Sequence, residues 1–199
     1  MDASKTALIL IGYQEDYFGE KGILKSVVEE SANTNQVLQN TQSLLERLQN
    51  SSALILQTPI IFSDDYSELT QPVGLLRAIK EAGAFRSGSA GSDPIAMLTS
   101  YGDRIRTIPG KDGFNAFANT ELSGTLNAHN IENVVLAGAV TSICIDSTGR
   151  SAHEQGYGVT VLSDCTCGRT NFEQEFYCEQ ILPLYADVCR AEDLLEKLN

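Results

Sequence analysis

The apolar residues of this chain fall into short continuous runs that alternate with longer segments of helical spacing. Residues 7–11 (ALILI) and 53–58 (ALILQT) lack the alternation of a half-exposed strand, so they predict strands buried on both faces. The second strand is expected to continue through residues 59–62. Four more strands are expected at residues 104–108, 134–137, 159–163 and 186–189.

Helical spacing predicts most of the segments between these strands. Leucine and valine residues between positions 37 and 48 recur on one helix face and predict a helix over residues 26–50. Residues 71–91 are less periodic, and their Gly/Ser-rich part, residues 84–91, predicts a loop. Other helices are expected after Pro94, at residues 119–129, from Cys144 onward, and at residues 171–182 and 191–198.

The regular alternation of strands and helices predicts the fold class. Right-handed crossovers between such elements give a parallel sheet covered by helices on both faces. We therefore expect a three-layer α/β/α fold with a six-stranded, mainly parallel Rossmann-like sheet. The length of 199 residues fits one domain, and no internal repeat or linker divides the chain, so residues 1–199 are expected to form a single domain.

Charge and hydropathy narrow the class of partner. The chain has 14 basic and 26 acidic residues, a formal net charge of −12, and the acidic residues are scattered. Without a basic patch, binding to nucleic acid is not expected, because phosphates would be repelled. No apolar run approaches the ~20 residues of a membrane-spanning helix, so membrane insertion is not expected either. A small-molecule substrate is the expected partner.

The five cysteines are expected to be reduced thiols of a cytoplasmic protein. Their odd number, the size of the domain and the absence of a signal peptide all argue against a disulfide framework. A zinc site is not expected, because Cys165 and Cys167 lack a second pair and both histidines fall in predicted helices. A redox role for this pair is the weaker alternative, since a single intervening residue strains a disulfide ring.

Residues 133–150 (NVVLAGAVTSICIDSTGR) read as a strand, a turn of small residues and a helix that begins near Cys144. In a parallel sheet such a turn lies at the carboxyl edge, where ligands bind. The unpaired N–H groups and the positive dipole end of the helix favour a thiolate and can hold a developing oxyanion. A buried structural thiol is the alternative interpretation, and this segment alone does not decide between them.

Four ordered blocks of this sequence resemble the isochorismatase-like cysteine hydrolase superfamily, which includes nicotinamidases, carbamoylsarcosine amidases and related amidohydrolases. Each block is weak alone, but their order along nearly the whole chain is specific. The blocks are Gln14-x-Asp16-aromatic after the first strand, Lys111 ahead of Asn115-Ala116-Phe117-x-x-Thr120-x-Leu122, Gly138-x-x-Thr141-x-x-Cys144-x-x-Ser147-Thr148, and Gly156-Tyr157-x-Val159 leading to Asp164.

The resemblance implies a chemistry for the site. Cys144 matches the nucleophile that attacks an amide-type carbon, and Lys111 matches the cation that stabilises the thiolate and the transition state. Backbone N–H groups at Val140 and Cys144 match the oxyanion hole, where the family has a cis peptide bond, here between Ala139 and Val140. The implied reaction cleaves a C–N bond of a small amide or ureido substrate through a thioester, without a cofactor, in a homo-oligomer.

The chain departs from the family at Gly12, where other members have a catalytic aspartate that shuttles protons. Asp64 and Asp65, after the strand expected beside the first one, are the favoured substitutes. Other carboxylates considered are Glu15, Asp16 and Asp112. If none of them acts, the chain is instead a non-catalytic relative that binds a small molecule or serves as an interaction scaffold.

Further residues are expected to line a substrate pocket, and a metal site is not expected. The pocket residues are Gly12, Tyr13, Tyr17, Phe18, Phe85 and Phe117. Tyr13, Tyr17 and Phe18 could equally pack their loop against the core. Nicotinamidase-type members bind a metal through an aspartate and histidines after the second strand, whereas residues 63–68 contain no histidine. Isochorismate-cleaving members lack the cysteine, which argues against vinyl-ether hydrolysis here.

Overall fold

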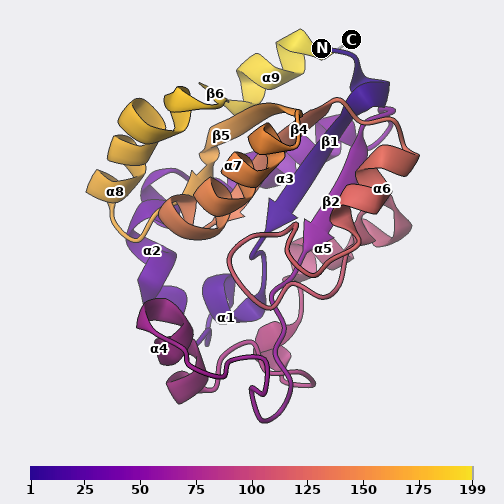
Figure 1. The fold of residues 1–199 in the computed structure, drawn as a ribbon. Coiled ribbons are helices and arrows are strands. Elements are labelled where there is room, and N and C mark those ends of the chain that lie inside the picture. Colours follow the sequence, from indigo (N-terminus) through magenta and orange to yellow (C-terminus); the bar gives the residue numbers. More distant parts are fainter. Residues whose placement is uncertain (199) are drawn as a thin grey trace.

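A computed structural model describes residues 1–198 and contains one six-stranded sheet in the order β3-β2-β1-β4-β5-β6 (Figure 1). All neighbouring strands pair in parallel. The predicted three-layer α/β/α class is therefore confirmed. The strands are β1 Thr6–Ile11, β2 Leu54–Thr58, β3 Arg106–Thr107, β4 Asn133–Ala139, β5 Gly158–Cys167 and β6 Asp187–Cys189.

Both faces of the sheet are covered by helices, as the continuous apolar runs predict. Leu8 and Leu10 of β1 pack on the same side as α2 (Lys25–Thr34), α3 (Val37–Leu48) and α9 (Ala191–Lys197). The alternate residues of β1 face the opposite layer. There the packing helices are α6 (Leu122–Ala128) and α7 (Asp146–Glu154), which lie in front of the sheet in Figure 1.

The strand order places a topological switch between β1 and β4. The chain builds the sheet outward from β1 to β3, then returns to β4 and continues in the other direction. At such a switch the connections leave the two strand ends in opposite directions and open a crevice for a ligand. The carboxyl end of β1 faces α1 (Glu15–Phe18), and α4 (Gly74–Ala82) lies farther along the same edge (Figure 1). α5 (Ala96–Thr99) follows them in the chain.

Some elements differ from the sequence-based prediction. The single helix expected over residues 26–50 is two helices, because Gln36 adopts a left-handed φ of 51°. The Asn40 side chain holds this break by donating to the carbonyls of Asn35 and Asp164. The helix α4 was not predicted. β3 is shorter than expected because residues 102–104 form a 3-10 turn, from which the Arg104 side chain donates to carbonyls at and beyond the end of α3, including that of Leu48.

β5 is longer than predicted and carries an irregularity opposite β4, where the register shifts between Leu136 and Gly138. The extra residues bring Cys167 beside Ala139 at the carboxyl edge. The remaining helix is α8 (Asn171–Phe176); shorter 3-10 turns are Ala3–Lys5, Ala90–Ser92, Gly102–Arg104 and Leu182–Leu184, and π-helical turns are Thr141–Ile145 and Tyr177–Ile181. Within residues 1–198, no helix combines the length and apolar character needed to cross a membrane.

Candidate active site

The turn that follows β4 holds Cys144 at the switch point of the sheet. The peptide bond between Ala139 and Val140 is cis, as predicted. The Val140 carbonyl accepts the N–H groups of Ile143 and Ile145 at 3.0 and 3.2 Å. Cys144 is 4% exposed and is followed directly by α7. The turn therefore holds a thiol at the carboxyl edge of the sheet.

Lys111 is the cation nearest to this thiol. Its backbone pairs with Ile60, which extends the line of β2 beyond the end of the strand. The side chain is 1% exposed, and its Nζ donates to the Gly113 carbonyl at 2.5 Å and to Cys144 Sγ at 3.7 Å. The structure therefore brings an ammonium group and a thiol together in the interior of the chain.

The Asn115–Phe117 block is tied to the nucleophile helix, as its place in the sequence pattern suggested. The Ala116 N–H donates to Thr148 Oγ1 at 3.0 Å, one turn beyond Cys144. Phe117 belongs to the same buried cluster as Cys144 and stacks on Tyr157, with ring centroids 6.2 Å apart. Tyr157 precedes β5 at the amino edge of the sheet, so this contact does not place Phe117 at the edge that holds Cys144.

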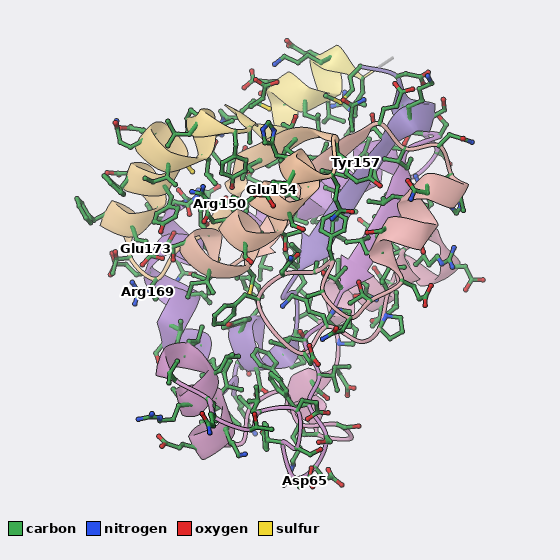
Figure 2. All side chains as sticks on the ribbon, viewed as in Figure 1. Asp65, Arg150, Glu154, Tyr157, Arg169 and Glu173 are labelled. Atoms are coloured by element: carbon green, nitrogen blue, oxygen red, sulfur yellow. The ribbon has the colours of Figure 1, made fainter. Side chains whose placement is uncertain are left out.

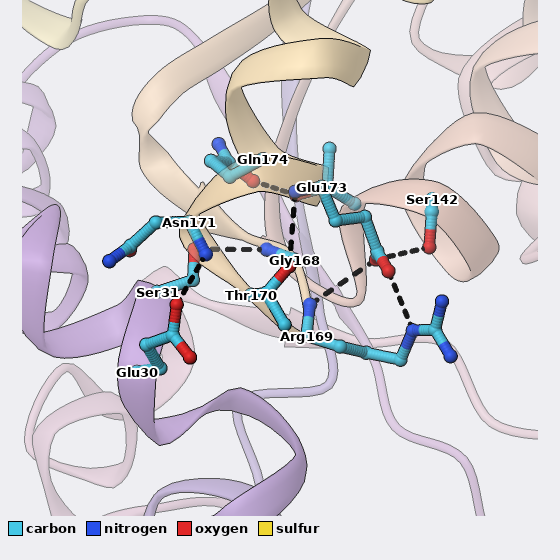
Figure 3. A network of polar contacts seen from close by, with 10 residues as sticks. Glu30, Ser31, Ser142, Gly168, Arg169, Thr170, Asn171, Glu173 and Gln174 are labelled. Carbon is cyan, nitrogen blue, oxygen red and sulfur yellow. Dashed lines mark hydrogen bonds and ion pairs between the residues drawn. The ribbon is translucent and has the colours of Figure 1, made fainter.

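Two hydroxyl groups of the Cys144 turn are held by α8 (Figure 3). Thr141 donates to Gln174 Oε1 and Ser142 donates to Glu173 Oε1, both at 2.5 Å. Glu173 also accepts Arg169 Nε at 2.6 Å. Sequence reasoning missed these positioning residues. The Thr170–Glu173 spacing of a helix N-cap marked the start of α8, but nothing in it indicated the contact with the turn.

Asp16 is fully engaged in holding the loops above the sheet. It is 2% exposed, and its Oδ2 accepts the Phe85 N–H at 2.7 Å. Gln14 also links these loops, because its Nε2 donates to the carbonyls of Ile60 and Ser92 at 2.9 and 2.8 Å. These two residues fix α1 and the loop around Phe85 over the ends of β1 and β2.

The structure does not bring Asp64 or Asp65 to Cys144. β2 does lie beside β1, as expected, but the chain runs on past the site through Phe62, which pairs with Arg86. Asp64 and Asp65 are exposed, and Asp65 accepts hydrogen bonds from Ser63 and Ser67 of its own loop. Figure 2 shows Asp65 at the lower tip of the molecule. Among the described residues, no carboxylate forms an ion pair or hydrogen bond with Lys111 Nζ.

The aromatic residues after β1 divide between two roles. Tyr13 packs toward the core, where its hydroxyl pairs with Thr41 Oγ1 at 2.6 Å and donates to the Cys165 carbonyl at 3.0 Å. Phe18 stacks on Tyr13 at 5.4 Å. Tyr17 instead lies over Gly12 and meets Phe85 edge to face at 4.9 Å. Only Tyr17 and Phe85 of this group cover the end of β1.

Residues 6–193 of this chain match the protein family described as the isochorismatase domain. The chain belongs to the isochorismatase family. Membership of this family indicates a hydrolase.

Relatives of this isochorismatase-family chain are distant but extensive. The uncharacterized isochorismatase family protein YddQ of Bacillus subtilis (strain 168) is 26% identical over 178 residues, covering 89% of this chain and 84% of that protein. The ureidoacrylate amidohydrolase RutB of Stutzerimonas stutzeri (strain A1501) is 25% identical over 181 residues, covering 83% of this chain and 71% of that enzyme. A solved cysteine hydrolase from Pseudomonas syringae pv. phaseolicola 1448A shares the fold, with a TM-score of 0.84 at 19% identity, covering 99% of this chain and 93% of that one.

The other four thiols of this isochorismatase-family chain are poor nucleophiles at neutral pH. Burial raises the pKa of Cys165 to about 12 and that of Cys178 to about 11, and it raises the pKa of Cys167 and Cys189 as well. All five cysteines are free. A thiol reagent used at neutral pH therefore discriminates Cys144 from the rest if Lys111 activates it.

We expect Gly12→Asp to destabilise this isochorismatase-family chain. Gly12 has a φ of +73°, and a Cβ at this position would lie 2.9 Å from the Ala139 carbonyl oxygen and 3.4 Å from Tyr17 Cδ2. The left-handed backbone alone costs a side chain about 1–2 kcal/mol. The melting temperature measures the effect, and Gly12→Ala is the control that carries the backbone cost without the carboxylate. An aspartate variant as stable as the wild type contradicts this account.

Proposed function

We propose that this protein is a cysteine-dependent hydrolase that cleaves a C–N bond of a small amide or ureido substrate through a thioester. The observation that carries the proposal is the buried pair of Lys111 and Cys144, whose Nζ and Sγ atoms lie 3.7 Å apart at the switch point of the sheet. A buried ammonium group without a carboxylate partner needs another anion nearby, and the thiolate supplies it.

The proposed reaction begins with attack of the Cys144 thiolate on the carbonyl carbon of the substrate. The carbonyl oxygen becomes an oxyanion, and the N–H groups of Val140 and Cys144 are the proposed donors to it. Collapse of the tetrahedral intermediate releases the amine and leaves a thioester on Cys144, which water then hydrolyses. Lys111 stabilises the thiolate at the start and at the end of the cycle.

A groove beside the Cys144 turn is the proposed approach for the substrate. Its volume is about 790 Å³, which suits a small molecule, and its lining includes Phe114, Ser142, Ile143 and Arg169. The lining of this groove does not itself include Lys111 or Cys144, but Ser142 and Ile143 belong to the Cys144 turn. A larger groove of about 850 Å³ between α2, α8 and β6 includes no residue of that turn. We therefore assign the substrate to the first groove. Its mixture of aromatic walls and one arginine favours a substrate with an apolar body and an acidic group.

One observation favours a second candidate function, a non-catalytic small-molecule binder. The residue at the end of β1 is Gly12, and no carboxylate among the described residues takes part in the Lys111–Cys144 pair. A chain that retained the pair only for binding would still have a reactive thiol. The two candidates therefore differ in turnover and not in thiol reactivity.

The test combines thiol labelling with turnover. We expect iodoacetamide at pH 7 to alkylate Cys144 faster than any other cysteine, as read by mass spectrometry of peptides, and to inactivate the enzyme in proportion. Turnover is measured as ammonia release from ureidoacrylate, N-carbamoylglycine, maleamate and nicotinamide. A reactive Cys144 without turnover on any of the four favours the binder, and a Cys144 that alkylates no faster than a free thiol contradicts both roles for the pair.

A further inference from the structure

The proposed reaction lacks one group, a proton donor for the departing nitrogen. An amide nitrogen leaves a tetrahedral intermediate readily only when it is protonated, and a positioned donor typically contributes about 10²–10⁴-fold to the rate. Asp16 is occupied by the Phe85 N–H, and Asp64 and Asp65 are exposed on their own loop. Lys111 is committed to the sulfur and to the Gly113 carbonyl, and its charge is needed when the thiolate returns.

Tyr17 occupies the space that the glycine at the end of β1 leaves open. Its ring atoms Cδ2 and Cε2 lie 3.4 and 3.5 Å from the position that a Cβ on Gly12 would take. Gly12 itself adjoins Ala139, the last residue before the Cys144 turn, since Ile11 pairs with Gly138. The phenol ring therefore lies over the junction of β1 and β4, where Cys144 follows.

The Tyr17 hydroxyl is free to act on a substrate. It makes no hydrogen bond with any residue in the described part of the chain, in contrast to the hydroxyls of Tyr13 and Tyr66. It is also absent from the fully occluded polar atoms without partners, which in residues 1–198 are Thr58 Oγ1 and Asn171 Oδ1. Tyr17 is only 3% exposed and belongs to the buried cluster that covers the β1 end of the sheet, so its unpartnered hydroxyl is a buried donor without an acceptor among the described residues.

The surroundings hold Tyr17 rigidly. Its ring packs edge to face on Phe85, and the residue before it, Asp16, accepts the Phe85 N–H at 2.7 Å. Its own N–H donates to the Gln14 carbonyl at 3.0 Å. A donor on such a fixed element keeps its orientation through the reaction.

We propose that the Tyr17 hydroxyl is the proton donor to the leaving nitrogen, which rests on the proposed cysteine chemistry. When the C–N bond breaks, the O–H proton moves to nitrogen and the electron pair of the O–H bond remains on the phenolate. Water then attacks the thioester, one of its protons returns to the phenolate, and the C–S bond breaks to restore the thiolate. The sum is amide plus water giving carboxylic acid plus amine.

Electrostatics fit this order of events. Burial, and after it the charge of the Cys144 thiolate, raise the pKa of Tyr17 well above its usual range, so the phenol is protonated in the resting enzyme. Formation of the C–S bond moves the negative charge from sulfur to the carbonyl oxygen, and collapse of the intermediate to the neutral thioester leaves neither atom charged. The phenol therefore becomes a stronger acid at the step that needs its proton, and the reformed thiolate raises its proton affinity again.

The experiment compares Tyr17→Phe with Tyr66→Phe, a control that removes another buried hydroxyl, one that donates to the Ala84 carbonyl at 2.8 Å. For Tyr17→Phe we expect an unchanged melting temperature, an unchanged rate of Cys144 alkylation and a loss of about 10²-fold or more in kcat on the best amide of the panel. Tyr66→Phe is expected to lower the melting temperature while kcat stays within a factor of two.

A substrate that needs no proton donor separates acid catalysis from positioning. The burst of p-nitrophenolate from p-nitrophenyl acetate reports acylation with a leaving group that departs unprotonated, so Tyr17→Phe is expected to retain it. Equal losses on ester burst and amide turnover, or amide activity within threefold of the wild type, overturn the assignment. A Cys144-dependent burst without any amide turnover in the wild type also overturns it but leaves the nucleophile in place. Absence of any Cys144-dependent reaction overturns this inference and the proposed function together.

Discussion

Cys144→Ala is expected to lower kcat on the best amide of the panel by roughly 10⁴–10⁶-fold, the loss that follows removal of a covalent nucleophile. No other thiol can replace it. Burial raises the pKa of Cys165, Cys167 and Cys178, and the fourth, Cys189, lies on the edge strand β6. The N–H groups of the turn survive the substitution, so substrate binding is expected to change little. Ammonia release and substrate affinity are the measurements.

A second readout and a matched control variant test this prediction independently of turnover. The thioester is expected as a mass increase on the Cys144 peptide after an acid quench of the wild type, and it is expected to disappear in Cys144→Ala. Cys189→Ala removes a half-buried thiol on β6 and is expected to leave turnover unchanged. Retention of a tenth or more of the wild-type kcat by Cys144→Ala would show that another group performs the attack.

Lys111→Met is expected to slow alkylation of Cys144 at pH 7 and to reduce kcat by about 10²–10³-fold. The substitution removes the positive charge that stabilises the thiolate and the developing oxyanion. The methionine fills the volume of the buried stem. Since an ammonium group that is 1% exposed is costly to bury, we expect the melting temperature of this variant to change little or to rise.

Lys80→Met is the matched control for this prediction. Lys80 Nζ donates to the carbonyls of Tyr66 and Leu69 at 3.4 and 3.1 Å and has no sulfur among its partners. Its replacement is expected to affect the melting temperature and leave alkylation of Cys144 unchanged. If Cys144 of the Lys111→Met variant is alkylated at the wild-type rate at pH 7, the ammonium group does not stabilise the thiolate. The Lys111–Cys144 pair then no longer supports the proposed function.

The architecture of this protein was readable from its sequence because each signal was local. The continuous apolar runs of β1 and β2 indicate that both faces of the sheet are buried, and the alternation of strands with helices predicts parallel crossovers. The place of Cys144 after the apolar strand β4 predicted its position at the carboxyl edge, and the ordered blocks around Lys111 and Asn115 indicated the same site. The break between α2 and α3 was missed, since it depends on the contact of Asn40 with Asp164 on β5.

The tertiary structure alone decided what occupies the end of β1. Sequence reasoning looked for a replacement carboxylate at Asp64 and Asp65, because it could rank neighbours by strand order but could not follow the path of the loop beyond Phe62. The same limit applied to Asp16, whose partner Phe85 is far away in the chain. Which groups meet across such separations is set by packing and hydrogen bonds between distant segments, which no local pattern encodes.

The sequence by itself determined a parallel α/β sheet and a thiol at its carboxyl edge, since burial and strand order follow from residue patterns a few positions long. Only the folded chain decided that Glu173 and Gln174 hold the turn of that thiol and that a free phenol lies over Gly12. Each of these contacts joins segments separated by many residues, and its existence depends on the angles of the loops between them. The physical reason is that hydrogen bonds and charge pairs act over a few ångströms of space, not along the chain.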